Sequence, residues 1–108
     1  MIGPAELAAM KPSACFINVG RGDTVDEPAL ARALADRRIA AAAIDVFAQE
    51  PPPANHPFYG LDNVILSPHV SGFLPSYDDR CAELFAENLR RYLASAPLLN
   101  LVDRTLGY

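Results

Sequence analysis

Three polar residues that can bind or protonate a small acid lie at equal intervals along the chain. Arg21, Asp45 and His69 are each 24 residues from the next, and each stands near the end of a short apolar segment or just after one. If these segments are parallel strands of one sheet, all three residues lie at its carboxyl edge, where open α/β sheets bind ligands. Glu50 lies in the loop that leaves the second segment, so it can reach the same edge.

This set of side chains fits the reduction of a 2-oxo acid. The guanidinium fork of Arg21 matches a carboxylate, or a carboxylate beside a carbonyl. His69 can exchange a proton with a carbonyl or hydroxyl oxygen near neutral pH, and a hydrogen bond from the histidine to Glu50 would hold its tautomer. Asp45 can accept a hydrogen bond from an amide. Because no side chain carries a hydride, the reaction requires a nicotinamide cofactor, NAD or NADP.

Each of these residues also has an ordinary structural explanation. An arginine after a strand is usually a surface loop residue, and Asp45 can cap the turn that follows it. His69 can be a buried histidine bonded to backbone, and Glu50 can be solvated. Their convergence on one edge favours a shared site. His56, in a proline-rich loop, is interpreted as structural or exposed. Three aromatic residues are expected in the core more than in a pocket: Tyr59, Phe73 and Tyr77.

The segments that must position these residues alternate between strand and helix. Residues 14–19, 41–46 and 64–67 are short apolar runs typical of strands, and the first run predicts a strand covered on both faces. Between the first two runs, Asp26 is expected to cap a helix. A short helix is predicted to open at Gly3–Pro4 and a longer one to run from Tyr77 or Asp78 to about Ser95. The apolar stripes of the two longer helices are Ala29, Leu30, Ala33 and Leu34, and Cys81, Leu84, Phe85, Leu89 and Tyr92.

Strand, helix and strand over residues 14–46 form a βαβ unit, so the predicted fold class is α/β with a parallel sheet of about three strands. Three strands are few for such a sheet, which indicates part of a larger fold. The 108 residues are 51% hydrophobic and 20% charged, as in globular proteins.

The composition also excludes several kinds of partner. The net charge is −4, and the longest basic runs are pairs, so no nucleic acid is expected. No apolar stretch approaches the roughly 20 residues of a membrane span, and no signal peptide or metal site is predicted. Cys15 and Cys81 are expected to be buried free thiols, which favours a cytoplasmic location.

At these residues the chain resembles the D-isomer-specific 2-hydroxyacid dehydrogenases. Residues 16–22, which include Asn18, Gly20, Arg21 and Gly22, resemble the family's second signature. Residues 43–47 followed by Glu50 and Pro51 resemble its third. Residues 63–72 resemble the segment with the catalytic histidine, and residues 88–108 the closing helix and tail. The motifs occur in the family's order and spacing, so the resemblance is specific and covers essentially the whole chain.

The resemblance implies a role for each matching position. Arg21 would bind the substrate carboxylate and carbonyl, His69 would be the general acid and base, and Glu50 would pair with His69. Asp45 would contact the nicotinamide amide. The glutamate at position 50, where related formate dehydrogenases have glutamine, favours a 2-oxo or 2-hydroxy acid substrate. The residues implied at the cofactor are Val19, Gly20, Arg21, Gly22, Asp45, His69 and Gly72.

The chain departs from the family in two places and lacks one motif. Leu74 replaces a common threonine, and Gly20 replaces a more usual alanine or serine. The G-x-G-x-x-G turn that holds the pyrophosphate is absent from these 108 residues. We therefore expect residues 1–76 to be the second half of a Rossmann-like NAD(P)-binding domain. Residues 77–108 are expected to be a closing helix and tail that pack on a substrate domain.

Three interpretations follow from the resemblance. The first is a piece of an active dehydrogenase for an acid of the glyoxylate, hydroxypyruvate or phosphoglycerate type, inactive alone and a homodimer in its full-length form. The second is a non-catalytic binding or interaction module with the same half-fold. The third is a chain that pairs with a separate N-terminal partner. Arg21, Glu50 and His69 together favour the first, because a degenerate protein would be under no constraint to keep all three.

Overall fold

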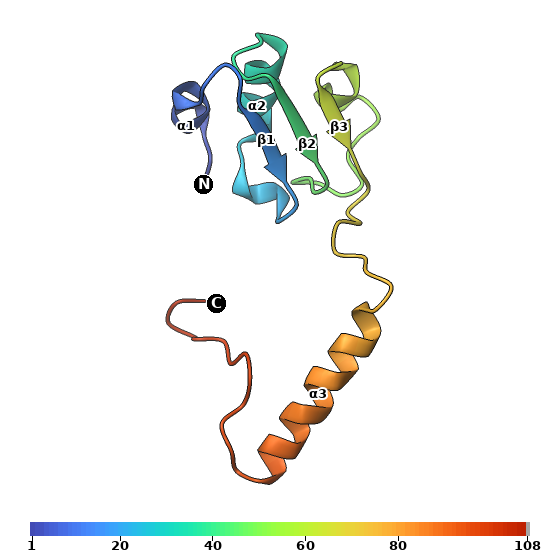
Figure 1. The fold of residues 1–108 in the computed structure, drawn as a ribbon. Coiled ribbons are helices and arrows are strands. Elements are labelled where there is room, and N and C mark those ends of the chain that lie inside the picture. The colour runs from blue at the N-terminus through green and yellow to red at the C-terminus, as the bar shows by residue number, and fades with distance from the viewer. Residues whose placement is uncertain (108) are drawn as a thin grey trace. The chain divides into compact units, whose positions relative to one another are not determined.

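The chain divides into two compact units, one that ends at Gly72 and one that begins at Phe73 (Figure 1). The computed structural model describes residues 1–107. The first unit contains the sheet, and the second contains the longest helix. The expected division between residues 76 and 77 stays a prediction about domain roles.

The first unit is built on a sheet of three parallel strands in the order β1-β2-β3. Asn18 of β1 pairs with Ile44 of β2, which pairs with Leu66 of β3, so the three strands end level with one another. This arrangement confirms the predicted α/β class and brings the three strand-end loops to one edge. The strands are β1 (Cys15–Asn18), β2 (Ala41–Ile44) and β3 (Val64–Leu66).

Helix α2 (Glu27–Ala35) connects β1 to β2, as the apolar stripe predicts. The Asp26 side chain accepts a hydrogen bond from the Ala29 backbone N–H at 2.8 Å, which satisfies one of the free donors at the helix start. Helix α1 (Pro4–Ala9) contacts α2. Two 3-10 turns complete the unit: η1 (Gly22–Thr24) and η2 (Pro57–Gly60).

The core lies between α2 and one face of the sheet, and the other face is open within this unit (Figure 1). Ile17 and Ile65 are exposed there, although both belong to strands. Strand side chains alternate between faces, so a helix on one face leaves every second residue uncovered. The expectation that β1 is covered on both faces is therefore wrong, and Cys15 is exposed for the same reason. The largest fully buried side chains are Leu7, Leu30, Leu34, Ile39, Val46 and Phe58.

The second unit consists of α3 (Tyr77–Leu93) and the segment after it. Both ends of this helix agree with the prediction from its apolar period. The side-chain amide of Asn88 donates to the Leu99 carbonyl at 3.2 Å and accepts from the Leu99 N–H at 2.7 Å, which ties the tail to the helix. Cys81 is exposed, contrary to expectation, because α3 has no buried residue.

Two further findings concern surfaces. The three aromatic residues expected in the core are exposed, namely Tyr59, Phe73 and Tyr77. Among residues 1–107, no helix combines the length and the apolar character needed to cross a bilayer.

Candidate active site

The structure brings the three predicted catalytic side chains to one open hollow at the carboxyl edge of the sheet. Arg21 comes from the loop after β1, Glu50 from the loop after β2 and His69 from the loop after β3. The hollow has a volume of about 280 Å³. Its other lining residues are Gly22, Asp23, Phe47 and Ala48.

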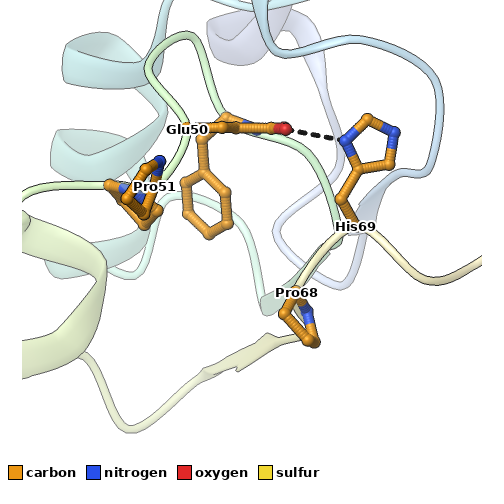
Figure 2. Close-up of a pocket in the computed structure, with 6 residues that line it drawn as sticks. Glu50, Pro51, Pro68 and His69 are labelled. Carbon is orange, nitrogen blue, oxygen red and sulfur yellow. Dashed lines mark hydrogen bonds and ion pairs between the residues drawn. The ribbon is translucent and has the colours of Figure 1, made fainter.

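Glu50 and His69 form a direct pair. Oε2 of Glu50 lies 2.7 Å from Nδ1 of His69, and the two side chains are 37% and 46% exposed (Figure 2). The other carboxylate oxygen, Oε1, accepts a hydrogen bond from the Phe47 N–H at 2.9 Å. The hydrogen bonds from His69 and Phe47, aided by the charge of Arg21, hold the pKa of Glu50 below its ordinary value.

The ionised state of Glu50 fixes the tautomer of its partner. A carboxylate can only accept hydrogen bonds, so the proton between the two groups belongs to Nδ1 of His69. The second ring nitrogen, Nε2, points away from Glu50 (Figure 2). It has no hydrogen-bond partner in the part of the chain that the structure describes, so it is the nitrogen available for proton exchange.

Arg21 is exposed and keeps most of its donors available. Nη1 of Arg21 donates to the Gly20 carbonyl at 2.7 Å, and no other bond of this guanidinium is present among residues 1–107. The Arg21 carbonyl, by contrast, accepts hydrogen bonds from Asn18 and Thr24. The backbone at this position is thus fixed while the side chain remains free to bind an anion.

Asp45 does not line the hollow and is buried. It is only 2% exposed, and both carboxylate oxygens accept hydrogen bonds. Oδ1 accepts from the Ser67 hydroxyl and from the Val70 N–H at 2.9 Å, and Oδ2 accepts from the Ser71 N–H at 2.9 Å. Hydrogen bonds from Ser67 and Ser71 hold the pKa of Asp45 well below its usual range. Asp45 therefore caps the turn after β3, and the alternative that it caps the turn after itself is wrong.

The turn that Asp45 caps holds His69 in an uncommon conformation. His69 has a φ of 55°, in the left-handed region that residues other than glycine rarely occupy. Its N–H donates to the Asp45 carbonyl at 2.9 Å. Such a conformation persists where the surrounding bonds hold it, and it is found often at functional sites.

Asn18 has an equivalent position under the Arg21 loop, and sequence reasoning missed it. It is 5% exposed. Its Nδ2 donates to the Arg21 carbonyl at 3.0 Å, and its Oδ1 accepts from the Gly20 N–H at 3.1 Å. The signal was a single polar residue inside the apolar run 14–19, because a buried amide must find partners.

Gly22 has a role in packing that its predicted place at the cofactor did not include. A Cβ atom on this residue would lie 2.0 Å from the carbonyl carbon of Phe47 and 2.2 Å from the nitrogen of Ala48. Only glycine allows the loop after β1 to approach the loop after β2 so closely. The other positions expected at the cofactor, Val19, Gly20 and Gly72, are exposed at the same edge.

A second histidine–glutamate pair supports the loop that contains Glu50. Nε2 of His56 lies 3.4 Å from Oε2 of Glu27, and the side chains are 10% and 11% exposed. Oε1 of Glu27 accepts from the Ala48 N–H at 2.8 Å, and Nδ1 of His56 accepts from the Phe58 N–H at 3.4 Å. This pair is structural, as expected for His56.

The site has a second, apolar side. A hollow of about 250 Å³ lies against the Glu50–His69 pair, and apart from that pair its lining is apolar (Figure 2). The apolar residues are Phe47, Pro51, Pro52 and Pro68.

Comparison with known proteins identifies a family and several relatives of the chain. A family model described as "D-isomer specific 2-hydroxyacid dehydrogenase, NAD binding domain" matches residues 1–71. The chain is 43% identical over 104 residues to a glyoxylate reductase of Aeropyrum pernix. The aligned segment covers 96% of this chain and 31% of that protein. It is 45% identical over 103 residues to glyoxylate/hydroxypyruvate reductase B of Yersinia enterocolitica, with 95% and 32% covered. The chain thus spans about a third of the length of the curated relatives it matches.

Solved structures that resemble this chain come from the same family and from a related reductase. A D-isomer specific 2-hydroxyacid dehydrogenase from Xanthobacter autotrophicus, crystallised with NADPH and MES, superposes with a TM-score of 0.89 at 42% identity, covering 97% of this chain and 43% of that one. An NADPH-dependent glyoxylate/hydroxypyruvate reductase from Sinorhizobium meliloti, crystallised with citrate, superposes with a TM-score of 0.74 at 36% identity. That match covers 91% of this chain and 31% of the other.

Proposed function

Because the chain belongs to the D-isomer specific 2-hydroxyacid dehydrogenase family, we propose that it supplies the catalytic edge of an NAD(P)-dependent oxidoreductase that interconverts a 2-oxo acid and its 2-hydroxy acid. The observation that carries this proposal is the grouping of Arg21, Glu50 and His69 around one hollow. A guanidinium with free donors, beside a histidine whose Nε2 is free, is the minimum set for binding and protonating such an acid.

Three side chains divide the work on the substrate. Arg21 binds the carboxylate through two of its N–H groups. His69 gives the proton on Nε2 to the carbonyl oxygen in the direction of reduction, and takes it back in the direction of oxidation. The Glu50 carboxylate accepts from Nδ1 throughout, so it stabilises the charged imidazole and keeps Nε2 toward the substrate.

The residues at the edge fit a nicotinamide group. Asp45 stands at the end of β2 beside this edge, and its ionised carboxylate is the group we propose to accept a hydrogen bond from the nicotinamide amide. The exposed backbone at Val19, Gly20 and Gly72 would line the ring. When bound, a reduced nicotinamide supplies the hydride that no side chain can supply.

The substrate we favour is a short acid such as glyoxylate or hydroxypyruvate. The relatives at 43% and 45% identity are named as reductases of these acids.

The 108 residues alone are expected to show no turnover. They contain no G-x-G-x-x-G turn, so the phosphates of the cofactor lack the cradle formed by a helix N-terminus. Purified chain mixed with NADH or NADPH and glyoxylate, hydroxypyruvate or pyruvate should leave the cofactor oxidation at background.

A chimaera tests the proposal directly. In it, this chain replaces the matched 104-residue segment of the Aeropyrum pernix glyoxylate reductase. We expect the chimaera to oxidise NADPH or NADH when glyoxylate is added, and Arg21→Gln in the chimaera to abolish the reaction. A chimaera that folds, as judged by circular dichroism and a cooperative melt, but does not turn over glyoxylate or hydroxypyruvate would contradict the proposal and favour a non-catalytic module.

A further inference from the structure

We propose that Asn18 and Asp45 are a matched pair of positioning residues, in which Asn18 sets the loop of Arg21 and Asp45 sets the turn of His69. This inference rests on the proposed function, since it assigns the two residues to the same site. Neither residue lines the hollow shared by Arg21, Glu50 and His69, so each would act on the substrate through the loop that it holds. The contact of Asp45 with the nicotinamide amide, proposed above, is separate from this role.

The two residues stand at the ends of neighbouring strands. Asn18 is the last residue of β1, and Asp45 directly follows β2. The Asp45 N–H donates to the Asn18 carbonyl at 3.0 Å, so the two residues are joined across neighbouring strands. Among residues 1–107 they are the two buried residues with polar or charged side chains. A buried polar group is unfavourable unless it is bonded, so the partners of these two side chains show what they hold.

Asn18 uses both ends of its amide on one loop. Its oxygen accepts from the Gly20 N–H and its nitrogen donates to the Arg21 carbonyl, so the two bonds span residues 20 and 21. The Cα of Arg21 therefore lies between two backbone groups that Asn18 holds, the Gly20 N–H and the Arg21 carbonyl. A side chain that offered only acceptors or only donors would lose one of these bonds and leave the backbone partner unpaired.

Asp45 uses its carboxylate on the other loop, and every partner is a donor. These partners lie on both sides of His69, with Ser67 before it and Val70 and Ser71 after it. The Asp45 carbonyl accepts from the His69 N–H itself. The left-handed conformation of His69 is thus enclosed by four bonds to a single residue.

The side chains of Asn18 and Asp45 have nearly the same shape, but their partners require different hydrogen-bonding groups. Asn18 must offer one donor and one acceptor, whereas Asp45 must offer acceptors alone. The near-isosteric exchanges Asn18→Asp and Asp45→Asn therefore each place the wrong hydrogen-bonding group opposite a fixed backbone group. They form a matched pair of tests, because volume and burial change little in either.

In the active chimaera, the two exchanges should affect different kinetic constants. Asp45→Asn displaces the proton donor, so kcat should fall by about 100-fold while KM for glyoxylate changes little, as a misplacement of about 1 Å can cause. Asn18→Asp displaces the carboxylate binder, so KM should rise by about 10-fold with a smaller change in kcat. A merely structural role would lower the fraction of folded protein and leave both constants of the folded enzyme unchanged.

The 108-residue chain itself provides a readout that needs no activity. By NMR, amide exchange at Val70 and Ser71 should accelerate in Asp45→Asn and stay parental in Asn18→Asp. The carbonyl carbon shift of Arg21 should move in Asn18→Asp, which removes the donor to that carbonyl, and stay parental in Asp45→Asn. The carboxyl pKa of Glu50, lowered mainly by His69, should rise toward its ordinary value in Asp45→Asn. Exchange rates and a Glu50 pKa equal to those of the parent in both variants would overturn the inference.

Two milder variants protect the test against misfolding. Ser67→Ala removes one partner of Asp45, and Thr24→Val removes a hydroxyl that donates to the Arg21 carbonyl. If the Asn18→Asp and Asp45→Asn proteins do not fold, these milder variants replace them. Ser67→Ala should then lower kcat, and Thr24→Val should raise KM, each by about 3-fold to 10-fold. Equal effects of both variants on both constants would refute the inference. An inactive parental chimaera would refute the proposed function alone, since the NMR measurements decide the positioning roles separately.

Discussion

The first unit contains two histidine–glutamate pairs that use the same chemical groups for opposite purposes. His69 and Glu50 are half-exposed, and within residues 1–107 one ring nitrogen of His69 has no hydrogen-bond partner. His56 and Glu27 are nearly buried, and both ring nitrogens of His56 have partners. A histidine–glutamate pair is therefore not by itself evidence of a site. A histidine is available for proton exchange when its carboxylate uses one nitrogen and the fold leaves the other open.

The two pairs meet at neighbouring peptide groups. The Phe47 N–H donates to Glu50 and the Ala48 N–H donates to Glu27. One dipeptide therefore fixes a carboxylate of each pair, and the buried pair supports the loop on which the exposed pair depends. This arrangement makes the comparison open to experiment, because each pair can be changed without touching the other.

The largest expected effect separates the two histidines by activity. In the chimaera, His69→Gln should lower kcat by about 100-fold to 10,000-fold, since it removes a general acid and base. The melting temperature should change little, because the side chain is half-exposed. His56→Gln is the matched control, and steady-state kinetics should show near-parental kcat with a lower melting temperature. Equal losses of kcat in the two variants would show that the comparison is wrong.

The next effect breaks both pairs together. Gly22→Ala places a Cβ atom 2.0 Å from the backbone of Phe47 and must displace the shared dipeptide. We expect a loss of about 1–3 kcal/mol in the free energy of unfolding, as overpacking typically causes, measured by urea denaturation. Gly60→Ala is the control, because nothing lies within 4 Å of the Cβ it would add. Similar stability in the two variants would contradict the close approach of the loops.

A smaller effect is expected from the buried pair alone. Glu27→Ala leaves the Ala48 N–H and the His56 ring without their partner. Unpaired groups of this kind typically cost about 1–3 kcal/mol, less where water reaches them. Urea denaturation of the 108-residue chain should therefore show a lower midpoint with an unchanged slope. A stability equal to that of the parent would mean that this pair does not hold the loop.

The smallest effect concerns the acid stability of the exposed pair. The folded pKa of Glu50 lies below its ordinary value, so its contribution to stability is complete above the unfolded pKa of about 4.3 and is lost as the pH falls through the folded pKa. Melting curves should show that the parent loses more stability than Glu50→Gln between about pH 5 and pH 3. Asp45 titrates in both proteins and does not affect the difference. If both proteins lose stability equally as the pH falls, the pairing of Glu50 with His69 does not contribute to stability.

The elements and the grouping at the edge could be predicted from sequence because they depend on local signals. Apolar runs mark the strands, Asp26 marks the start of α2, and parallel strands of similar length bring their ends together. The convergence of Arg21, Glu50 and His69 follows from that topology alone.

What could not be predicted depends on contacts between distant residues. Glu27 and His56 are 29 positions apart, and nothing in the sequence around either residue indicates that they meet. The capping of the His69 turn by Asp45 is similar, because it requires the geometry of the turn after β3. The exposure of Cys15 was missed for another reason, since an apolar run predicts a strand but does not say which faces are covered.

The charges around the hollow also bear on how fast an acid can arrive there. Arg21 is the one cation of its lining, whereas Asp23 and Glu50 are anions, and the chain as a whole has a net charge of −4. In these 108 residues taken alone, such charges would repel the proposed acid until it is close to Arg21, so its diffusional encounter would not be accelerated. Added salt would shorten the range of that repulsion to about 8 Å at physiological ionic strength. Within these 108 residues, the proposed acid would therefore be held by contact with Arg21 and would not be attracted from a distance.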